Sequence, residues 1–411
     1  MGGTLEQTTR VRTAPGSATG VVPPTPTLPL EGGGRGGRGP LAGLSALDLT
    51  GQLGWLLGKI LADLGAEVWK LDPPGGDPHR LEPPLLEGPA GCAGAEWVAF
   101  NAGKRRLDVD LLTESGRLRF RELAAAADFV LDSAEPGTLE ELGIGWPQLS
   151  ERSPALVMTS VTPYGQDGPL AHAPASDLEL MAAGGAAWLT GDPDRPPVRV
   201  TQPQAGPWAS AYAAIGTLIA HHHRRATCRG QHVDASAQCA VLPMLVHAPS
   251  FWELLGVSPV RAGALLFGRN VHGAATRNVW PCRDGYITWA IYGGPAGRQS
   301  NRGLVEWMAE RGMAHDFLLE MDWDAFDVAT VTPAEVERME AAIGPFLRTV
   351  TKRDFLEQAH ARRMLGYVVA TAPEIAADPQ LEARDVWRDV DVPELGRAVR
   401  LPAGWYRAAD R

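Results

Sequence analysis

The stretch that decides the fold is residues 46–71, which read ALDLTGQLGWLLGKILADLGAEVWKL. Its first four residues form a short apolar run that predicts a buried strand, and residues 66–71 predict a second strand. Between them, Trp55 to Leu64 carries apolar residues on most faces and predicts a helix. The unit is therefore a strand, a crossover helix and a parallel strand. Its first turn, residues 50–54, contains glycines but lacks the GxGxxG spacing, which argues against a nicotinamide cofactor.

The same alternation continues along the chain. A helix is predicted over residues 113–126 and another over 208–222, with strands at 129–131 and 155–159. Alternating strands and helices predict a mostly parallel sheet covered on both faces, with ligands at the carboxyl ends of the strands. The expected class is α/β, with a Rossmann-like large domain.

Composition changes divide the chain into four parts. Residues 1–40 are rich in Gly and Pro and are expected to be a disordered tail. Residues 41–245 are expected to form the first part of the large domain, and 246–350 a small α+β domain. Within the small domain, Asp284-Gly285 between two apolar runs predicts a hairpin. Residues 351–411, with a helix and then a strand at 366–369, are expected to return to the large domain.

Bulk composition excludes several classes of function. The 411 residues are 45% hydrophobic and carry a net charge of −10, which argues against nucleic-acid binding and against a polybasic membrane surface. No apolar run reaches the ~18 residues of a membrane helix, and no signal peptide is apparent, so we expect a cytoplasmic protein. No metal site is expected, because the four cysteines lack zinc spacing and consecutive histidines at 221–223 diverge on a helix.

Five stretches occur in an order that is typical of one protein family. They are residues 47–50 with 61–80, residues 101–111, residues 164–169, residues 230–234, and Glu374 followed by 378–384. With these motifs the chain resembles the family III CoA-transferases of the CaiB/BaiF type. This group includes formyl-CoA and carnitine CoA-transferases and α-methylacyl-CoA racemases. The resemblance runs from about Leu41 to Leu401.

This resemblance implies an architecture and a reaction. It implies two ring-shaped protomers threaded through each other, as a homodimer or as a heterodimer with a family III homologue. The substrates would be an acyl-CoA and a carboxylic acid, with no tightly bound cofactor. In such transferases an aspartate attacks the thioester to form a mixed anhydride, and CoA thiolate then returns to give an aspartyl thioester.

The family's nucleophile position falls on a residue that cannot perform this step. Aligning the small-residue helix 213–218 places Gly206 there, and residues 196–233 contain neither Asp nor Glu. The histidine that the racemase branch uses falls on Ser176. Asp177 is the candidate for substitute chemistry, with Glu179 nearby. The alternative for Asp177 is a helix cap or a hydrogen-bonded structural acid.

The resemblance also implies contacts to coenzyme A, although the electrostatics of one loop oppose them. These contacts fall on Gln52, Arg80, Lys104, Arg105, Val109, Ser133 and Gly137. In the loop after residue 132, Glu135 and Glu141 take positions where the family carries basic residues. An acid facing a diphosphate is unfavourable.

Three functions remain open from the sequence. The first is an acyl-CoA:carboxylate CoA-transferase that uses a displaced acid such as Asp177. The second is a catalytically impaired or non-catalytic subunit, paired with a homologue that supplies the aspartate. The third is an acyl-CoA racemase or isomerase.

Overall fold

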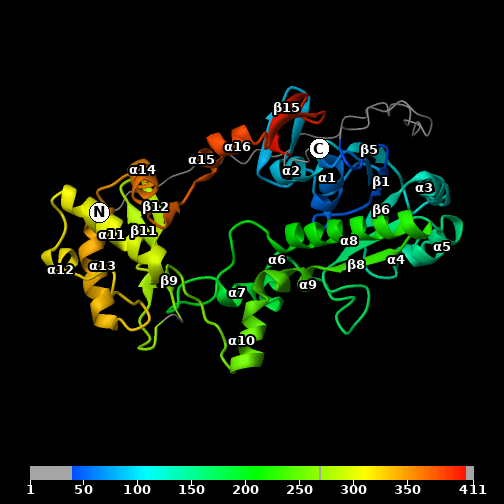
Figure 1. The fold of residues 1–411 in the computed structure, drawn as a ribbon. Helices are drawn as coiled ribbons and strands as arrows, with labels where there is room; N and C mark the ends of the chain where they lie inside the picture. Colours follow the sequence, from blue (N-terminus) through cyan, green and yellow to red (C-terminus); the bar gives the residue numbers. More distant parts are fainter. Residues whose placement is uncertain (1–38, 268–269, 404–411) are drawn as a thin grey trace. The chain divides into compact units, whose positions relative to one another are not determined.

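The large domain of the computed structural model is built on one parallel six-stranded sheet (Figure 1). The structure describes residues 39–267 and 270–403, so the expected tail at 1–40 lies almost entirely outside the described residues. The strands are β1 (Ser45–Asp48), β2 (Glu67–Asp72), β5 (Arg105–Asp108), β6 (Phe129–Asp132), β7 (Val157–Thr162) and β8 (His232–Ser236). Their order is β5-β2-β1-β6-β7-β8. This order reverses direction between β1 and β6, as in dinucleotide-binding folds, and confirms the predicted Rossmann-like class.

Helices predicted from the apolar periodicity are confirmed with small shifts at their ends. The helices of the large domain are α1 (Trp55–Asp63), α2 (Ala95–Asn101), α3 (Glu114–Ala126), α4 (Thr138–Glu141), α5 (Trp146–Arg152), α6 (Asp177–Ala183), α7 (Ala186–Leu189), α8 (Ala205–Thr227) and α9 (Ala237–Val241). A short hairpin, β3 (Leu85–Gly88) with β4 (Gly91–Gly94), precedes α2. The strands at 105–108 and 232–236 were not predicted, because charged and histidine side chains interrupt their apolar pattern.

Helix α8 packs against α1, β7 and β8 through small side chains. Ala205, Ala209 and Ala213 recur every four residues on its buried face, so the helix approaches its neighbours closely. The buried hydroxyl of Thr217 bonds to that of Thr159 on β7 at 2.7 Å. The helix begins three residues earlier than predicted, and this places Gly206 in its first turn.

The smaller domain has its own hydrophobic core, centred on Trp289, Trp307 and Phe346. Two helices, η1 (Leu242–Leu245) and α10 (His247–Leu255), precede this domain in the chain. Its own elements are β9 (Leu265–Leu266), β10 (Thr276–Arg277), β11 (Val279–Cys282), β12 (Gly285–Trp289), α11 (Gly294–Glu310), α12 (Asp316–Leu319) and α13 (Pro333–Leu347). Strands β11 and β12 form the predicted hairpin, with Cys282 opposite Gly285, so the turn itself is Arg283-Asp284.

The end of the chain contributes to both cores. Helix α14 (Lys352–Arg362) and β13 (Gly366–Val368) extend the small domain, because β13 pairs with β12 and Phe355 lies in the smaller core. After α15 (Ala372–Ala376) and α16 (Pro379–Ala383), β14 (Trp387–Val392) and β15 (Arg397–Pro402) form a hairpin. Its residues Val392 and Leu395 pack with Trp55 and Trp97 of the large domain. The return to the large domain is therefore made by residues 387–402.

Candidate active site

A cavity of about 340 Å³ opens where the strand order reverses, at the carboxyl ends of β1, β6 and β7. Gln52, Ser133 and Pro163 follow these three strands and line it. The N-terminal ends of α6 and α8 close another side through Asp177 and Gly206. The structure thus brings together four residues that the sequence analysis selected on separate segments. Open α/β sheets bind ligands at this edge.

The loop after β1 is held against the loop after β6 by a direct hydrogen bond. The Gly51 N–H donates to Ser133 Oγ at 2.8 Å. The next residue, Gln52, is exposed at the cavity mouth, and its Nε2 donates to Glu82 Oε2 at 2.6 Å. Gln52 and Ser133 therefore lie on one rim of the cavity, with Ser133 Oγ already occupied as an acceptor.

Gly206 is the second residue of α8 and faces the cavity without a side chain. A Cβ built at this position would lie 3.4 Å from Leu53 O and 3.5 Å from Gln52 O, which are ordinary contact distances. The first turn of a helix also favours a negative charge. The position therefore has room for a Cβ at the start of a helix, and it carries no side chain.

Asp177 lines the cavity and is the acid that the sequence offered for the covalent step. Its carboxylate caps α8 and not its own helix, α6. Its Oδ1 accepts hydrogen bonds from Gln204 N at 2.6 Å and from Ala205 N at 2.8 Å, at the start of α8. Its own helix is capped instead by Ser176 and Glu179 in a capping box. The other oxygen of Asp177, Oδ2, is buried and has no hydrogen-bond partner among the described residues. One carboxylate oxygen is thus structural, and the other is buried without a partner among the described residues.

The cavity is acidic. Glu96 of α2 lines it, and burial, together with Glu82 and Asp177, raises the pKa of Glu96 above its usual value. Sequence reasoning did not select Glu96 or its neighbour Phe100, which lines the same wall. Their only signal was a position just before the quoted motif at residues 101–111.

Lys104 forms a buried ion pair with Asp48, the last residue of β1. Its Nζ lies 2.7 Å from Asp48 Oδ2, and neither side chain is exposed. The ammonium also donates to Trp55 O at 2.7 Å and to Asn101 Oδ1 at 2.8 Å. Burial lowers the pKa of Lys104 to about 8, although Asp48 opposes this shift. Gly58 permits the arrangement, since a Cβ there would fall 2.1 Å from Asp48 Oδ2.

The other residues with implied CoA contacts do not line this cavity. Arg105 pairs with Glu67 at 2.8 Å and stacks on Trp69. Val109 is buried and donates its N–H to the carbonyl of the β2 terminus. Gly137 has a left-handed φ of 87° at the start of α4. The Arg80 guanidinium has no ion-pair partner among residues 39–267 and 270–403.

Two findings concern metals and membranes. No group of three or more metal-ligating side chains was found among the described residues. The helices that the structure describes include none with the length and apolar character needed to cross a bilayer.

Comparisons with known proteins agree on one family. The sequence model of the family described as "CoA-transferase family III" matches residues 41–410 of this chain. The chain is 35% identical over 363 residues to the succinyl-CoA:(R)-benzylsuccinate CoA-transferase subunit BbsE of Thauera aromatica, covering 88% of this chain and 86% of that protein. It is 30% identical to the succinyl-CoA–D-citramalate CoA-transferase of Chloroflexus aurantiacus, over 87% and 85% of the two chains.

Among solved structures, the chain is similar to a CaiB/BaiF family protein from Brucella suis, with a TM-score of 0.77 and 26% identity. The match covers 90% of this chain and 93% of the other. The sequence match and the shared fold both extend over the cavity and over the smaller domain. This chain therefore belongs to CoA-transferase family III.

Proposed function

We propose that this chain takes part in the transfer of CoA between carboxylic acids, with the thioester held in the cavity between α1, α6 and α8. The observation that carries the proposal is the convergence of Gln52, Asp177 and Gly206 on one cavity at the strand-order reversal. The relatives named above act with succinyl-CoA, so succinyl-CoA is the first donor to test.

The start of α8 supports the binding of a thioester carbonyl. Asp177 occupies the N–H groups of Gln204 and Ala205, and Pro207 has none. The Gly206 N–H is therefore the donor left in the first turn, at the wall of the cavity. A backbone donor at a helix N-terminus stabilises the oxyanion that forms when a thioester is attacked.

Within this chain, the carboxylate available for the covalent step is Asp177. Because Oδ2 is buried in the structure, this step requires its exposure to the cavity. Oδ2 then attacks the acyl carbon and forms an anhydride, and the C–S bond breaks to release CoA thiolate. The thiolate then attacks the Asp177 carbonyl carbon, and the acyl group leaves as its carboxylate. The acceptor carboxylate attacks the carbonyl carbon of the aspartyl thioester, which expels CoA thiolate and forms a second anhydride. The thiolate then attacks the acceptor's acyl carbon, so the new acyl-CoA and the free Asp177 carboxylate are released. Because Oδ1 stays bound to the start of α8, the carboxylate is held in one orientation.

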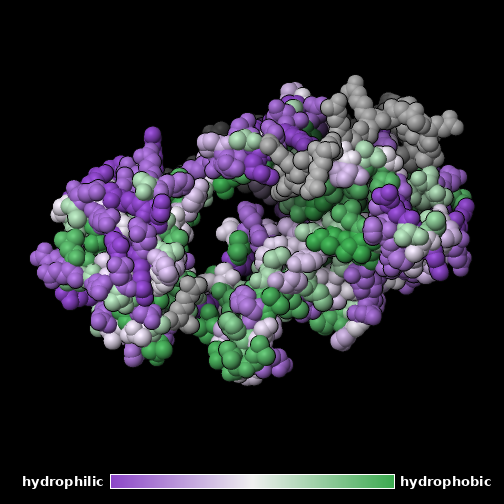
Figure 2. Space-filling model, viewed as in Figure 1, coloured by the Kyte–Doolittle hydropathy of each residue, from purple (hydrophilic) through white to green (hydrophobic). Residues whose placement is uncertain are grey.

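A second candidate is favoured by Gly206. In this view the chain is a non-catalytic subunit, and a homologous partner carries an aspartate at the equivalent place. Exposed apolar side chains support the binding of a second chain. Ile215 and Ile219 on α8 are 52% and 64% exposed, and Figure 2 shows apolar surface gathered over α10, where Trp252 and Leu254 are exposed. We propose that a second subunit, identical or homologous, covers these faces.

A trapping experiment separates the two candidates. The purified chain is incubated with succinyl-CoA and then with hydroxylamine or borohydride, and adducts are mapped by mass spectrometry. Use of Asp177 predicts an adduct in the wild type and in the surface control Glu122→Gln, and none in Asp177→Asn. Asparagine preserves the Oδ1 acceptor, so the α8 cap survives.

The non-catalytic role predicts no adduct on this chain and exchange activity only after a homologous subunit is added. Failure of succinyl-CoA to bind either the chain alone or such a mixture would overturn the proposed function. Light scattering of the same samples measures whether the chain is a homodimer or requires the homologue.

A further inference from the structure

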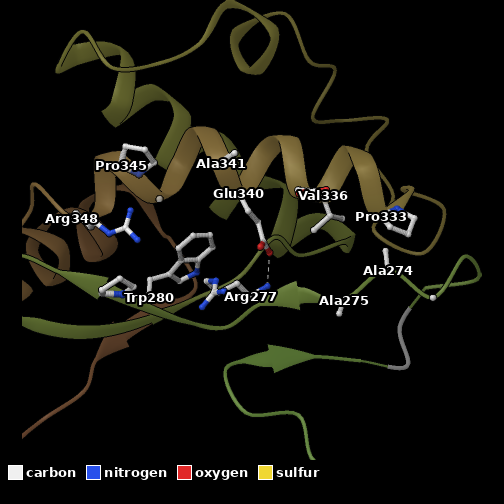
Figure 3. A pocket seen from close by; sticks show the side chains of 14 residues that line it. Ala274, Ala275, Arg277, Trp280, Pro333, Val336, Glu340, Ala341, Pro345 and Arg348 are labelled. Atoms are coloured by element: carbon white, nitrogen blue, oxygen red, sulfur yellow. Dashed lines mark hydrogen bonds between the residues drawn. The ribbon is translucent and has the colours of Figure 1, made fainter. Parts of the chain in front are cut away.

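A second and larger cavity lies in the small domain, apart from the cavity at α8. Its volume is about 520 Å³, and it is formed between α13 and the segment that carries β10 and β11 (Figure 3). None of its lining residues lines the cavity at α8. Nothing in the proposed CoA transfer uses it.

The cavity has an apolar floor because α13 presents small residues above an indole. Trp280 is buried and fixed by a hydrogen bond from its Nε1 to Trp289 O at 2.7 Å. Gly344 faces this ring, and a Cβ there would lie 3.5 Å from it. Val336 and Ala341 line the cavity further along α13. The result is a preformed apolar surface that can take a flat or branched hydrocarbon body.

Two arginines border this floor. Arg277 comes from β10, and its Cζ lies 5.5 Å from the centre of the Trp280 ring. Arg348 comes from the C-terminal end of α13, and Figure 3 shows its guanidinium extending from the helix toward the strands. Neither guanidinium forms an ion pair with any residue that the structure describes. Guanidinium groups that form no ion pair, beside an apolar wall, are suited to a carboxylate.

Glu340 fixes one of the arginines and limits the charge of the ligand. Its Oε1 accepts a hydrogen bond from the Arg277 backbone N–H at 2.6 Å, drawn as the dashed line in Figure 3. This bond ties β10 to α13 and holds Arg277 in place. A second acid, Glu337, also lines the cavity. Glu337 and Glu340 together match the formal charge of the two guanidinium groups, so a ligand with two negative charges is disfavoured.

We propose that this small-domain cavity binds a monocarboxylate with an apolar body, such as an aromatic or branched-chain acid. The carboxylate meets Arg348 and Arg277, and the body lies along the small-residue face of α13, beside the buried Trp280. The site is separate from CoA transfer, so its occupancy is measured by binding alone.

The probe is 4-fluorobenzoate, whose ¹⁹F resonance broadens and shifts when it binds. We expect saturable binding to the full chain and at least a tenfold weaker affinity in Arg348→Gln. Arg348 is an exposed residue at a helix end, so the variant should fold normally. Arg348→Lys keeps the charge without the planar fork and should fall between the two. The matched control is Arg353→Gln, which removes an exposed arginine paired with Glu357.

Two further measurements test the chemistry of the ligand. Glu340→Gln removes a negative charge but keeps an acceptor for the Arg277 N–H, so it should tighten benzoate binding several-fold. Inorganic phosphate and succinate should compete weakly, because one lacks an apolar body and both carry more charge near neutral pH.

The proposal is overturned by the absence of saturable 4-fluorobenzoate binding, or by binding that Arg348→Gln leaves unchanged. Phosphate binding as tightly as benzoate would overturn the apolar part of the assignment. Because the chain can bind or fail to bind benzoate whether or not it transfers CoA, failure here is distinguishable from failure of the proposed function.

Discussion

Replacing Lys104 with Met tests whether this lysine supports the fold or contacts CoA. The substitution leaves Asp48 wholly buried, with Oδ1 bonded to Thr50 N at 2.9 Å and to Thr50 Oγ1 at 2.6 Å. Burial alone would raise the pKa of Asp48, but Lys104 and Lys70 outweigh it and hold the pKa below its usual value. Without Lys104 the carboxylate loses its nearest cation.

Removing one partner of a buried ion pair costs about 3–5 kcal/mol. We therefore expect the free energy of unfolding, measured in urea by circular dichroism, to fall by about that amount. The melting temperature should fall by roughly 10 °C, at about 2–4 °C per kcal/mol for a domain of this size. The control Arg105→Met removes an exposed cation paired with Glu67 and should cost about 1 kcal/mol or less.

A double variant makes the test sharper. Asp48→Asn combined with Lys104→Met removes both charges of this pair, so it should recover part of the stability that the single lysine variant loses. CoA affinity, measured at a temperature where all variants are folded, should change little, because the Lys104 side chain is not exposed. A loss below about 1 kcal/mol together with a large loss of CoA affinity would refute this reasoning and make Lys104 a CoA contact.

Three other substitutions give separate tests. Burial raises the pKa of Asp132 from 3.8 to about 6. The contribution of this carboxyl to folding stability is therefore complete below pH 3.8 and is lost as pH rises through about 6. Asp132→Asn should raise the free energy of unfolding in urea by up to about 3 kcal/mol at pH 7.5, with little gain at pH 4. Gly206→Asp should keep its unfolding free energy within about 1 kcal/mol and gain a hydroxylamine-sensitive adduct with succinyl-CoA; continued absence of the adduct would contradict a surviving pocket. Asp177→Ala should lose about 1–2 kcal/mol because two N–H groups at the start of α8 lose their acceptor, whereas Asp177→Asn should lose much less; equal losses would count against the cap.

The sheet and its main helices followed from local pattern, because apolar periodicity reports which face of a segment is buried. The run at 46–49, the helix from Trp55 and the strand at 129–131 all appear where they were predicted. The strands β5 and β8 were not predicted, because Arg105, Arg106 and His232 interrupt their apolar pattern. Their burial depends on partners such as Trp69 and Trp146, which lie far away in the sequence.

The candidate site was predictable in its segments but not in its contacts. Family motifs selected Gln52, Ser133, Asp177 and Gly206, and the structure brings these four into one cavity. The role of Asp177 as a cap for α8 could not be foreseen, because its partners are backbone N–H groups 27 and 28 residues away.

The sequence by itself determined the alternating architecture, the family, and the absence of any Asp or Glu over residues 196–233. Only the tertiary structure decided that Lys104 is buried beside Asp48, that Asp177 keeps one oxygen unpaired, and that two arginines without an ion-pair partner among the described residues border a small-domain cavity. The physical reason is that periodicity records which face of a segment avoids water. Desolvation and ion pairing instead depend on distances between atoms, and these are set when distant segments pack together.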